Sequence, residues 1–205
     1  MKKKLIIFTR YPEAGRVKTR LIPALGPLGA AGLQQRMTED TLRIAEEAAA
    51  ENRLDLEIRY VGGDPGRMAD WLGTHRSYCG QGSGDLGEKM TRAFADAFQN
   101  HYHQVMLIGA DCPALTPRTL ADGFAVLLEH ELVLGPASDG GYYLIGLTRP
   151  CPELFRRQPW GGNVLLSATI VAARKLGLKL YLLEELADVD RPEDLENFGD
   201  HPDPE

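Results

Sequence analysis

Long apolar runs are missing from this sequence of 205 residues. The first apolar stretch, residues 5–8, is followed at once by polar residues and a proline. A secretory signal needs an apolar stretch of about 7 to 15 residues, and a membrane-spanning helix needs about 20. The sequence therefore predicts no membrane span, and we expect a cytoplasmic protein.

Cysteine is scarce. The three cysteines, Cys79, Cys112 and Cys151, lie far apart in the sequence, and no C-x-x-C pair occurs. Neither a zinc ribbon nor a disulfide framework is therefore indicated. We expect reduced, structural thiols, which agrees with a cytoplasmic location.

An excess of positive charge is also missing, because the chain carries a net charge of −6. Proteins that bind nucleic acids need a basic surface that displaces counterions from the phosphates, so this class is disfavoured. The charge is unevenly distributed. Residues 10–20 hold four basic residues and one acidic residue, so this segment has a net charge of +3 and the rest of the chain has a net charge of −9. A compact basic cluster in an acidic protein predicts a small anionic ligand.

The composition, with 43% apolar and 25% charged residues, is typical of a globular protein. A chain of this length can bury roughly 70% of the surface of its unfolded form. We expect one domain over residues 1–199, followed by a charged, proline-bearing tail over residues 200–205. The oligomeric state stays open, because an apolar helix face looks the same whether it packs against a core or a partner.

Strands and helices alternate along the sequence. Apolar runs and alternating patterns predict strands at residues 5–8, 54–61, 77–81, 105–108, 132–134, 142–147 and 178–183. Helical spacing and capping signals predict helices at residues 28–51, 65–72, 86–98 and 163–176, and others that begin at Thr116-Pro117 and near Pro192. This alternation indicates a three-layer α/β/α fold of the Rossmann-like class, with a mostly parallel sheet covered on both faces.

Four loops with polar residues follow predicted strands, at residues 9–20, 109–113, 136–141 and 188–190. In parallel sheets, ligands bind at the carboxyl ends of the strands. We therefore expect these four loops to meet at one edge of the sheet.

The first of these loops carries the basic cluster. Gly15 lets the backbone approach a phosphate closely, Lys18 supplies a point charge, and the arginines supply forks for pairs of phosphate oxygens. The spacing of glycine and lysine differs from that of a Walker A motif. A solvated charged loop is the alternative, but the position directly after the first strand favours phosphate binding. The predicted nucleotide-binding residues here are Thr9, Arg10, Gly15, Arg16, Lys18 and Arg20.

Asp111 follows the most apolar predicted strand. A carboxylate at this place projects into the cleft, and its oxygens suit Mg²⁺ or Mn²⁺ bound together with a nucleotide. The alternative is that Asp111 only forms the turn that follows. Cys112 beside it is a weaker candidate for a nucleophile, because no histidine lies in a suggestive pattern nearby.

Three further segments hold candidate site residues. Asp139, in a Ser-Asp-Gly-Gly sequence, could bind a sugar hydroxyl, but this sequence is also a strong signal for a strand-to-strand turn. Asp188 and Asp190 lie on opposite sides of an extended segment, so only one can face the cleft, and the other is expected to cap the helix that follows. The glycine-rich loop after the third strand could read a base or ribose through Gln81, Asp85 and Gly87.

Five segments, in this order, resemble a family of small bacterial transferases: FTRYPEAGRVKTRL, GDLGEKM, GADCPALTP, DGGYYLIGL and DVDRPEDL. Members of that family are described as glycosyltransferase-like and are associated with radical-SAM, selenodomain and arsenosugar-type biosynthetic genes. They belong to the nucleotide-diphospho-sugar transferase superfamily, which has the GT-A fold. The resemblance spans about residues 4–198.

The resemblance implies roles for several residues. The superfamily binds its nucleotide with the loop after the first strand, which corresponds here to Gly15, Arg16, Lys18 and Arg20. Its metal-binding aspartate corresponds to Asp111, and the late carboxylate that completes the metal site corresponds best to Asp190. The sequence departs from the Asp-x-Asp pattern of many glycosyltransferases of this fold, because Cys112 and Pro113 follow a single aspartate. In this respect it equally resembles nucleotidyltransferases such as the guanylyltransferase of deazaflavin cofactor synthesis.

The leading hypothesis is a metal-dependent glycosyltransferase with a nucleotide-diphospho-sugar donor and a small-molecule acceptor. Asp111 and Asp190 would hold the metal, Lys18 would bind the departing diphosphate, and Asp139 would bind a sugar or acceptor hydroxyl. The alternative enzyme is a nucleotidyltransferase, in which Lys18 and Arg16 stabilise a triphosphate and pyrophosphate leaves. A non-catalytic nucleotide-binding module is the third hypothesis.

Overall fold

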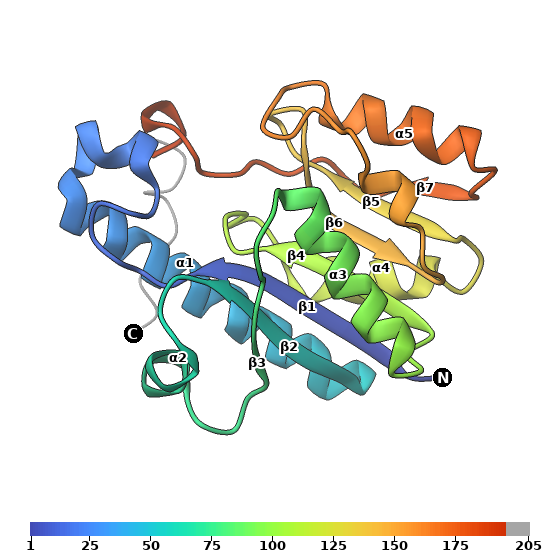
Figure 1. The fold of residues 1–205 in the computed structure, drawn as a ribbon, viewed down its shortest axis with the longest axis horizontal. Coiled ribbons are helices and arrows are strands. Elements are labelled where there is room, and N and C mark those ends of the chain that lie inside the picture. Colours follow the sequence, from blue (N-terminus) through green and yellow to red (C-terminus); the bar gives the residue numbers. More distant parts are fainter. Residues whose placement is uncertain (196–205) are drawn as a thin grey trace.

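The computed structural model of the chain describes residues 1–195 and is organised around one mixed β-sheet (Figure 1). Within these residues the sheet has seven strands in the order β3-β2-β1-β4-β6-β5-β7. The tail predicted over residues 200–205 lies outside the described residues. The strands are β1 (Lys3–Arg10), β2 (Leu54–Val61), β3 (Tyr78–Gly80), β4 (Gln104–Gly109), β5 (Leu132–Pro136), β6 (Tyr142–Leu147) and β7 (Leu180–Leu182).

The sheet is mostly parallel, as predicted. Only β6 runs against its neighbours: it pairs antiparallel with both β4 and β5, whereas the other four paired contacts in the described chain are parallel. The segment between β5 and β6 is accordingly a short hairpin turn, closed by hydrogen bonds from Gly140 N to Ala137 O (3.0 Å) and from Ala137 N to Gly141 O (3.1 Å). Because β5 is parallel to β1 and β4 in direction, this turn still lies at the carboxyl edge of the parallel strands.

Helices cover both faces of the sheet. They are α1 (Ile22–Asn52), α2 (Pro65–Leu72), α3 (Leu86–Gln99), α4 (Pro117–Val126) and α5 (Leu165–Lys175), with 3-10 turns η1 (Thr19–Leu21), η2 (Pro152–Phe155) and η3 (Pro192–Asp194). The first helix begins earlier than predicted, but Gly26, with a φ of 68°, breaks it directly before Pro27. The helix expected from Pro192 is a 3-10 turn over the residues that the structure describes.

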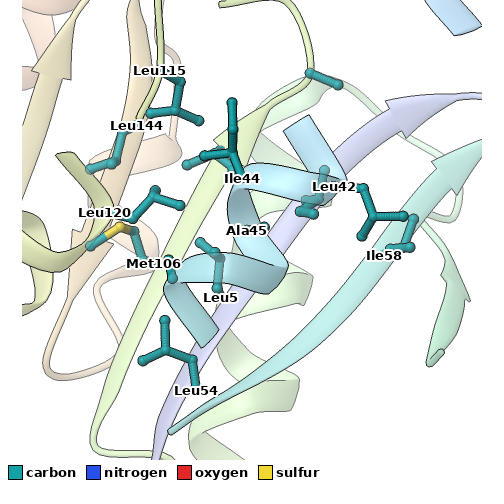
Figure 2. Packing of buried hydrophobic residues seen from close by; sticks show 14 of the residues in the cluster. Leu5, Leu42, Ile44, Ala45, Leu54, Ile58, Met106, Leu115, Leu120 and Leu144 are labelled. Atoms are coloured by element: carbon teal, nitrogen blue, oxygen red, sulfur yellow. The ribbon is translucent and has the colours of Figure 1, made fainter. Parts of the chain in front are cut away.

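Two apolar cores separate the three layers, so the predicted architecture is confirmed. Alternate residues of β1 point to opposite faces. Leu5 and Ile7 belong to a first core with α1, α2 and α4, and Figure 2 shows Leu5 there beside Ala45 and Met106. Ile6 and Phe8 belong to a second core with α3 and α5.

A buried ionic cluster ties three elements together. Arg59 of β2, which is 3% exposed, donates to Glu57 on the same strand and to Asp96 of α3 (2.8 Å). Lys4 of β1 donates to the same glutamate. Burial raises the pKa of Glu57, but the hydrogen bonds and charges of Lys4 and Arg59 outweigh burial and hold this pKa below its ordinary value.

None of the helices within residues 1–195 combines the length and apolar character needed to cross a bilayer.

Candidate functional site

A cavity of about 620 Å³ opens at the carboxyl edge of the parallel strands. Its walls come from the ends of β1 and β4, the loop after β1, the loop after β3 with the first turns of α3, and β6. Of the residues predicted for the site, nine line it: Thr9, Arg10, Arg16, Lys18, Arg20, Gln81, Asp85, Asp111 and Asp190. Gly15, Gly87 and Asp139 are not among its lining residues.

The basic loop folds tightly over this edge. Gly15 has a φ of 79° and Lys18 a φ of 43°, so the chain turns twice through the left-handed region. Arg16 N donates to Glu13 O (3.0 Å) in the first turn. The buried side chain of Val17 anchors the loop. As a result Lys18 points inward, with 6% of its side chain exposed, whereas the side chain of Arg16 is 76% exposed.

Lys18 connects the loop after β1 to the segment that contains Val189. Its Nζ donates to Val189 O (2.6 Å) and lies 3.9 Å from Asp111 Oδ2. Val189 N in turn donates to Asp111 O (3.0 Å). Arg20 forms an ion pair with Asp190. The final described segment therefore crosses from β7 to the start of α1, as Figure 1 shows, and Asp190 on this segment lines the cavity.

Asp188 lies beside the cavity but is not among its lining residues, and the resemblance points to Asp190 as the second metal ligand. Burial, together with the nearby carboxylates of Asp139 and Asp111, raises the pKa of Asp188 to about 6. Val189, between the two aspartates, packs into a small apolar cluster with Leu21, Leu33 and Met37. Asp190 then lines the cavity, and Asp188 lies near Asp111 and Asp139. No local pattern could have shown this, because those contacts come from distant residues.

The predicted cap for the last helix is wrong. Asp194, not Asp188 or Asp190, accepts the hydrogen bonds from the backbone N–H groups of Asp190 (2.9 Å) and Arg191 (2.7 Å). Both earlier aspartates are thereby left with their carboxylates directed elsewhere: Asp190 pairs with Arg20, and Asp188 lies near Asp111 and Asp139.

Asp139 has the turn geometry that its sequence also predicted. Its Oδ1 accepts from Gly141 N (2.7 Å) inside the β5–β6 hairpin. Gly140 has a φ of 87°, and a Cβ there would lie 2.1 Å from Asn163 O, so the hairpin packs directly on the loop before α5. The carboxylate of Asp139 still contributes negative charge near Asp188.

The glycine-rich loop after β3 is held in place by hydrogen bonds at both of its ends. Asp85 and Glu88 form a capping box at the start of α3. Arg92, one of the residues that sequence reasoning missed, donates to Gln81 O (2.9 Å) and Ser83 O (2.5 Å). Gly87 is required for packing, since a Cβ there would lie 2.5 Å from Phe155 O.

Cys112 is a buried thiol. Burial, together with the neighbouring carboxylates of Asp111 and Asp188, raises its pKa to about 12. The reactive thiolate is therefore negligible at neutral pH. The structure does not favour a nucleophilic Cys112.

The donors at the site fit a divalent cation that arrives with a phosphate ligand. Asp111 and Asp188 offer oxygen ligands. Their mutual repulsion, which adds to the effects of burial and of Asp139 on the raised pKa of Asp188, would be relieved by a cation. No group of three His, Cys, Asp or Glu side chains within residues 1–195 is placed to hold a metal by itself. In magnesium sites, one or two carboxylates commonly act together with phosphate oxygens and water.

Comparisons with known proteins identify the family and the fold. The family described as "Uncharacterized protein conserved in bacteria (DUF2064)" matches residues 41–162. The crystal structure of a candidate nucleotide-diphospho-sugar transferase from Desulfovibrio desulfuricans G20 is similar with a TM-score of 0.88 and 33% identity, over 98% of this chain and 89% of that chain. No curated protein matches the sequence.

More distant structures share the fold. Glucosyl-3-phosphoglycerate synthase from Mycobacterium tuberculosis, in complex with Mg²⁺ and UDP, has a TM-score of 0.59 and 14% identity, over 95% of this chain and 74% of that chain. 4-Diphosphocytidyl-2C-methyl-D-erythritol synthase from Anaerococcus prevotii DSM 20548 has a TM-score of 0.60 and 10% identity, over 95% and 94%. The fold is thus that of the nucleotide-diphospho-sugar transferases, as the sequence predicted.

Proposed function

The chain belongs to the DUF2064 family of bacterial proteins, and we propose that it is a metal-dependent glycosyltransferase that uses a nucleotide-diphospho-sugar donor. One observation supports this proposal: Lys18, Asp111 and Asp190 line one cavity at the carboxyl edge of the sheet, and Asp188 lies close enough to Asp111 for their charges to interact. A donor of this kind needs both cations for its diphosphate and carboxylates for a metal, and the cavity brings the two together.

The basic loop would bind the diphosphate. Arg16 is exposed at the cavity and has only a surface ion pair with Glu13 (3.5 Å), so its guanidinium is free to bind phosphate oxygens. Lys18 already points inward next to Asp111. These preorganised cations would stabilise the negative charge that develops on the leaving diphosphate.

Asp111 and Asp188 are the residues that would hold the divalent metal, Mg²⁺ or Mn²⁺. Asp190, the second ligand implied by the sequence, stays a candidate, although it pairs with Arg20. When bound, the metal would neutralise charge on the phosphates of the donor. Asp139 remains a proposed contact for a sugar or acceptor hydroxyl. An association with radical-SAM or arsenosugar-type biosynthesis remains part of the same proposal and bears on the acceptor.

Nucleotidyl transfer is the second candidate. It is favoured by the single aspartate at Asp111, where Cys112 and Pro113 follow in place of a second acidic residue. One of the proteins of the same fold is a diphosphocytidyl-methylerythritol synthase. In this reaction the same loop would bind a triphosphate, and pyrophosphate would leave.

Product analysis separates the two reactions. The protein is incubated with Mn²⁺ and either a panel of nucleotide-sugars or a panel of nucleoside triphosphates, together with bacterial small-molecule extract as a source of acceptors. We expect a nucleoside diphosphate to be released from a nucleotide-sugar, and no pyrophosphate from any triphosphate. Pyrophosphate release, absent in an Asp111→Asn control, would replace the first candidate with the second.

A further inference from the structure

β7 leaves one edge of the sheet open. Within the described residues only β5 pairs with it, and it ends the strand order (Figure 1). Leu183 N, directly after β7, donates to Leu134 O of β5 (2.8 Å), and Lys179 O, directly before β7, accepts from the backbone N–H that precedes β5 (2.9 Å). Successive residues of a strand point their backbone groups to opposite sides. The N–H and C=O groups of Leu180 and Leu182 are therefore directed away from the sheet.

The open edge is apolar. β7 consists of Leu180, Tyr181 and Leu182, without a charged residue or a proline, and the last two are each 43% exposed. Exposed edge strands are usually protected by charges, prolines or bulges, because open backbone groups beside apolar side chains pair with another strand. The strand at the other edge, β3, contributes none of the exposed large apolar side chains of residues 1–195. An edge suited to pairing is therefore found at the β7 end of the sheet.

Other exposed apolar side chains lie on the elements next to β7. Val171 lies on α5, and Leu176 lies in the turn that leads from α5 toward β7. Leu128 follows α4 and is close in sequence to His130, whose ring lies 5.3 Å from that of Tyr181 between centroids. Because α4 and α5 cover opposite faces of the sheet, a strand added at β7 would meet apolar side chains on both faces.

The two ends of β7 carry opposite charges. Arg174, Lys175 and Lys179 precede the strand, Glu184 and Glu185 follow it, and all five are exposed. In an antiparallel pair of strands, the start of one strand lies beside the end of the other. Two copies of β7 in this arrangement would bring basic residues of each copy close to acidic residues of the other, whereas a parallel arrangement would bring like charges together. The edge is therefore complementary to a second copy of itself.

We propose that two copies of this chain pair their β7 strands antiparallel about a two-fold axis at Tyr181, so that the two sheets become one. With this centre, Leu180 of each copy lies opposite Leu182 of the other, and each of these pairs exchanges both of its backbone hydrogen bonds. The two tyrosines form the central pair, which has no hydrogen bonds. No residue of β7 lines the cavity, so the inference does not depend on the proposed function.

Sedimentation velocity of the full chain at several concentrations tests the association. Short paired strands with a small apolar area are typical of a weak interface, so we expect a monomer–dimer equilibrium with a Kd on the order of 10 µM. Leu182→Pro removes an N–H group that points away from the sheet, and Tyr181→Lys places two like charges at the axis. Each change should weaken the association at least about 10-fold.

Leu28→Lys is the matched control, because Leu28 is an 80% exposed leucine on α1, and α1 packs on β1 and β2, far from β7 in the strand order. This variant should associate like the wild type. Thermal melting checks that each variant is folded. A wild type that stays monomeric up to about 200 µM, or a dimer that is unchanged in either folded β7 variant, overturns the inference.

A disulfide tests the register of the pairing. At the proposed axis the Cα atoms of the two Tyr181 residues lie about 4.5 Å apart, within the range that a disulfide bridges. With oxidised glutathione as the oxidant, Tyr181→Cys should form a linked dimer on a non-reducing gel at least about 10-fold faster than the wild type or Leu28→Cys. Equal rates for Tyr181→Cys and Leu28→Cys would contradict the proposed pairing.

Discussion

Replacement of Asp111 by asparagine is expected to lower turnover by on the order of 1000-fold or more. The carboxylate is the proposed metal ligand nearest to Lys18, 3.9 Å away, and loss of such electrostatic stabilisation costs several kcal/mol in the transition state. The fold should survive, because the side chain is 47% exposed. The steady-state rate and the urea midpoint, measured on the same preparation, separate the two effects.

A matched control for this variant is Asp122→Asn. Asp122 lies on α4, pairs only with Arg118 (3.5 Å) among the described residues and is 57% exposed. We expect it to keep the wild-type rate. If Asp111→Asn retained more than a tenth of the wild-type rate in a folded protein, Asp111 would have no part in the mechanism.

The largest expected loss of stability comes from Glu57→Gln. This change leaves the charges of Lys4 and Arg59 without their shared carboxylate in the buried cluster between β1, β2 and α3. Breaking one partner of a buried ion pair costs about 3 kcal/mol or more, because the remaining charge is uncompensated. Urea denaturation at pH 7 measures the difference in the free energy of unfolding.

The exposed pair on α1 provides the comparison. Glu47→Gln removes a surface ion pair with Arg43 (3.2 Å), in which Glu47 is 51% exposed, and should change stability by less than about 0.5 kcal/mol. A similarly small change for Glu57→Gln would show that the buried cluster does not stabilise the fold.

The cluster also predicts a pH dependence. The pKa of Glu57 is lower in the folded protein than its ordinary value of 4.5, so its contribution is present above about pH 4.5 and is lost as the pH falls through the folded-state pKa. The difference in stability between wild type and Glu57→Gln should therefore shrink in acid.

Structural features that depend on residues close together in the sequence could be predicted. The strand at residues 54–61 and the helix at residues 65–72 have the predicted bounds, because alternation, capping by Asp64 and a following proline are local signals. The antiparallel direction of β6 could not be predicted from residues that are close in the sequence. A Ser-Asp-Gly-Gly segment is compatible with a ligand loop or a hairpin, and only pairing with β4 and β5 decides between them.

The candidate site shows the same division. The loop after β1 and Asp111 could be located because each directly follows an apolar strand. The placement of the segment with Asp188 depends on the contact between Lys18 and Val189, which are 171 residues apart in the sequence. Gln34, which lines the cavity, could not be singled out either, because in a helical pattern it reads as one of two consecutive polar residues, and only its bonds to Thr9 and Thr38 show that it is buried.

The central claim is that the basic loop binds nucleotide phosphates, and calorimetric titration of Arg16→Ala tests it most directly. Arg16 lines the cavity, yet its side chain is 76% exposed and has only a surface pair with Glu13, so its removal should not disturb the fold. Arg118→Ala, on the outer surface of α4 with the side chain 87% exposed, is the control. With Mn²⁺, we predict saturable binding of at least one nucleoside diphosphate to the wild type and to Arg118→Ala, and binding about 10-fold weaker to Arg16→Ala, as expected for the loss of a charge-assisted hydrogen bond. Equal binding by all three proteins, or binding by none, would contradict the account.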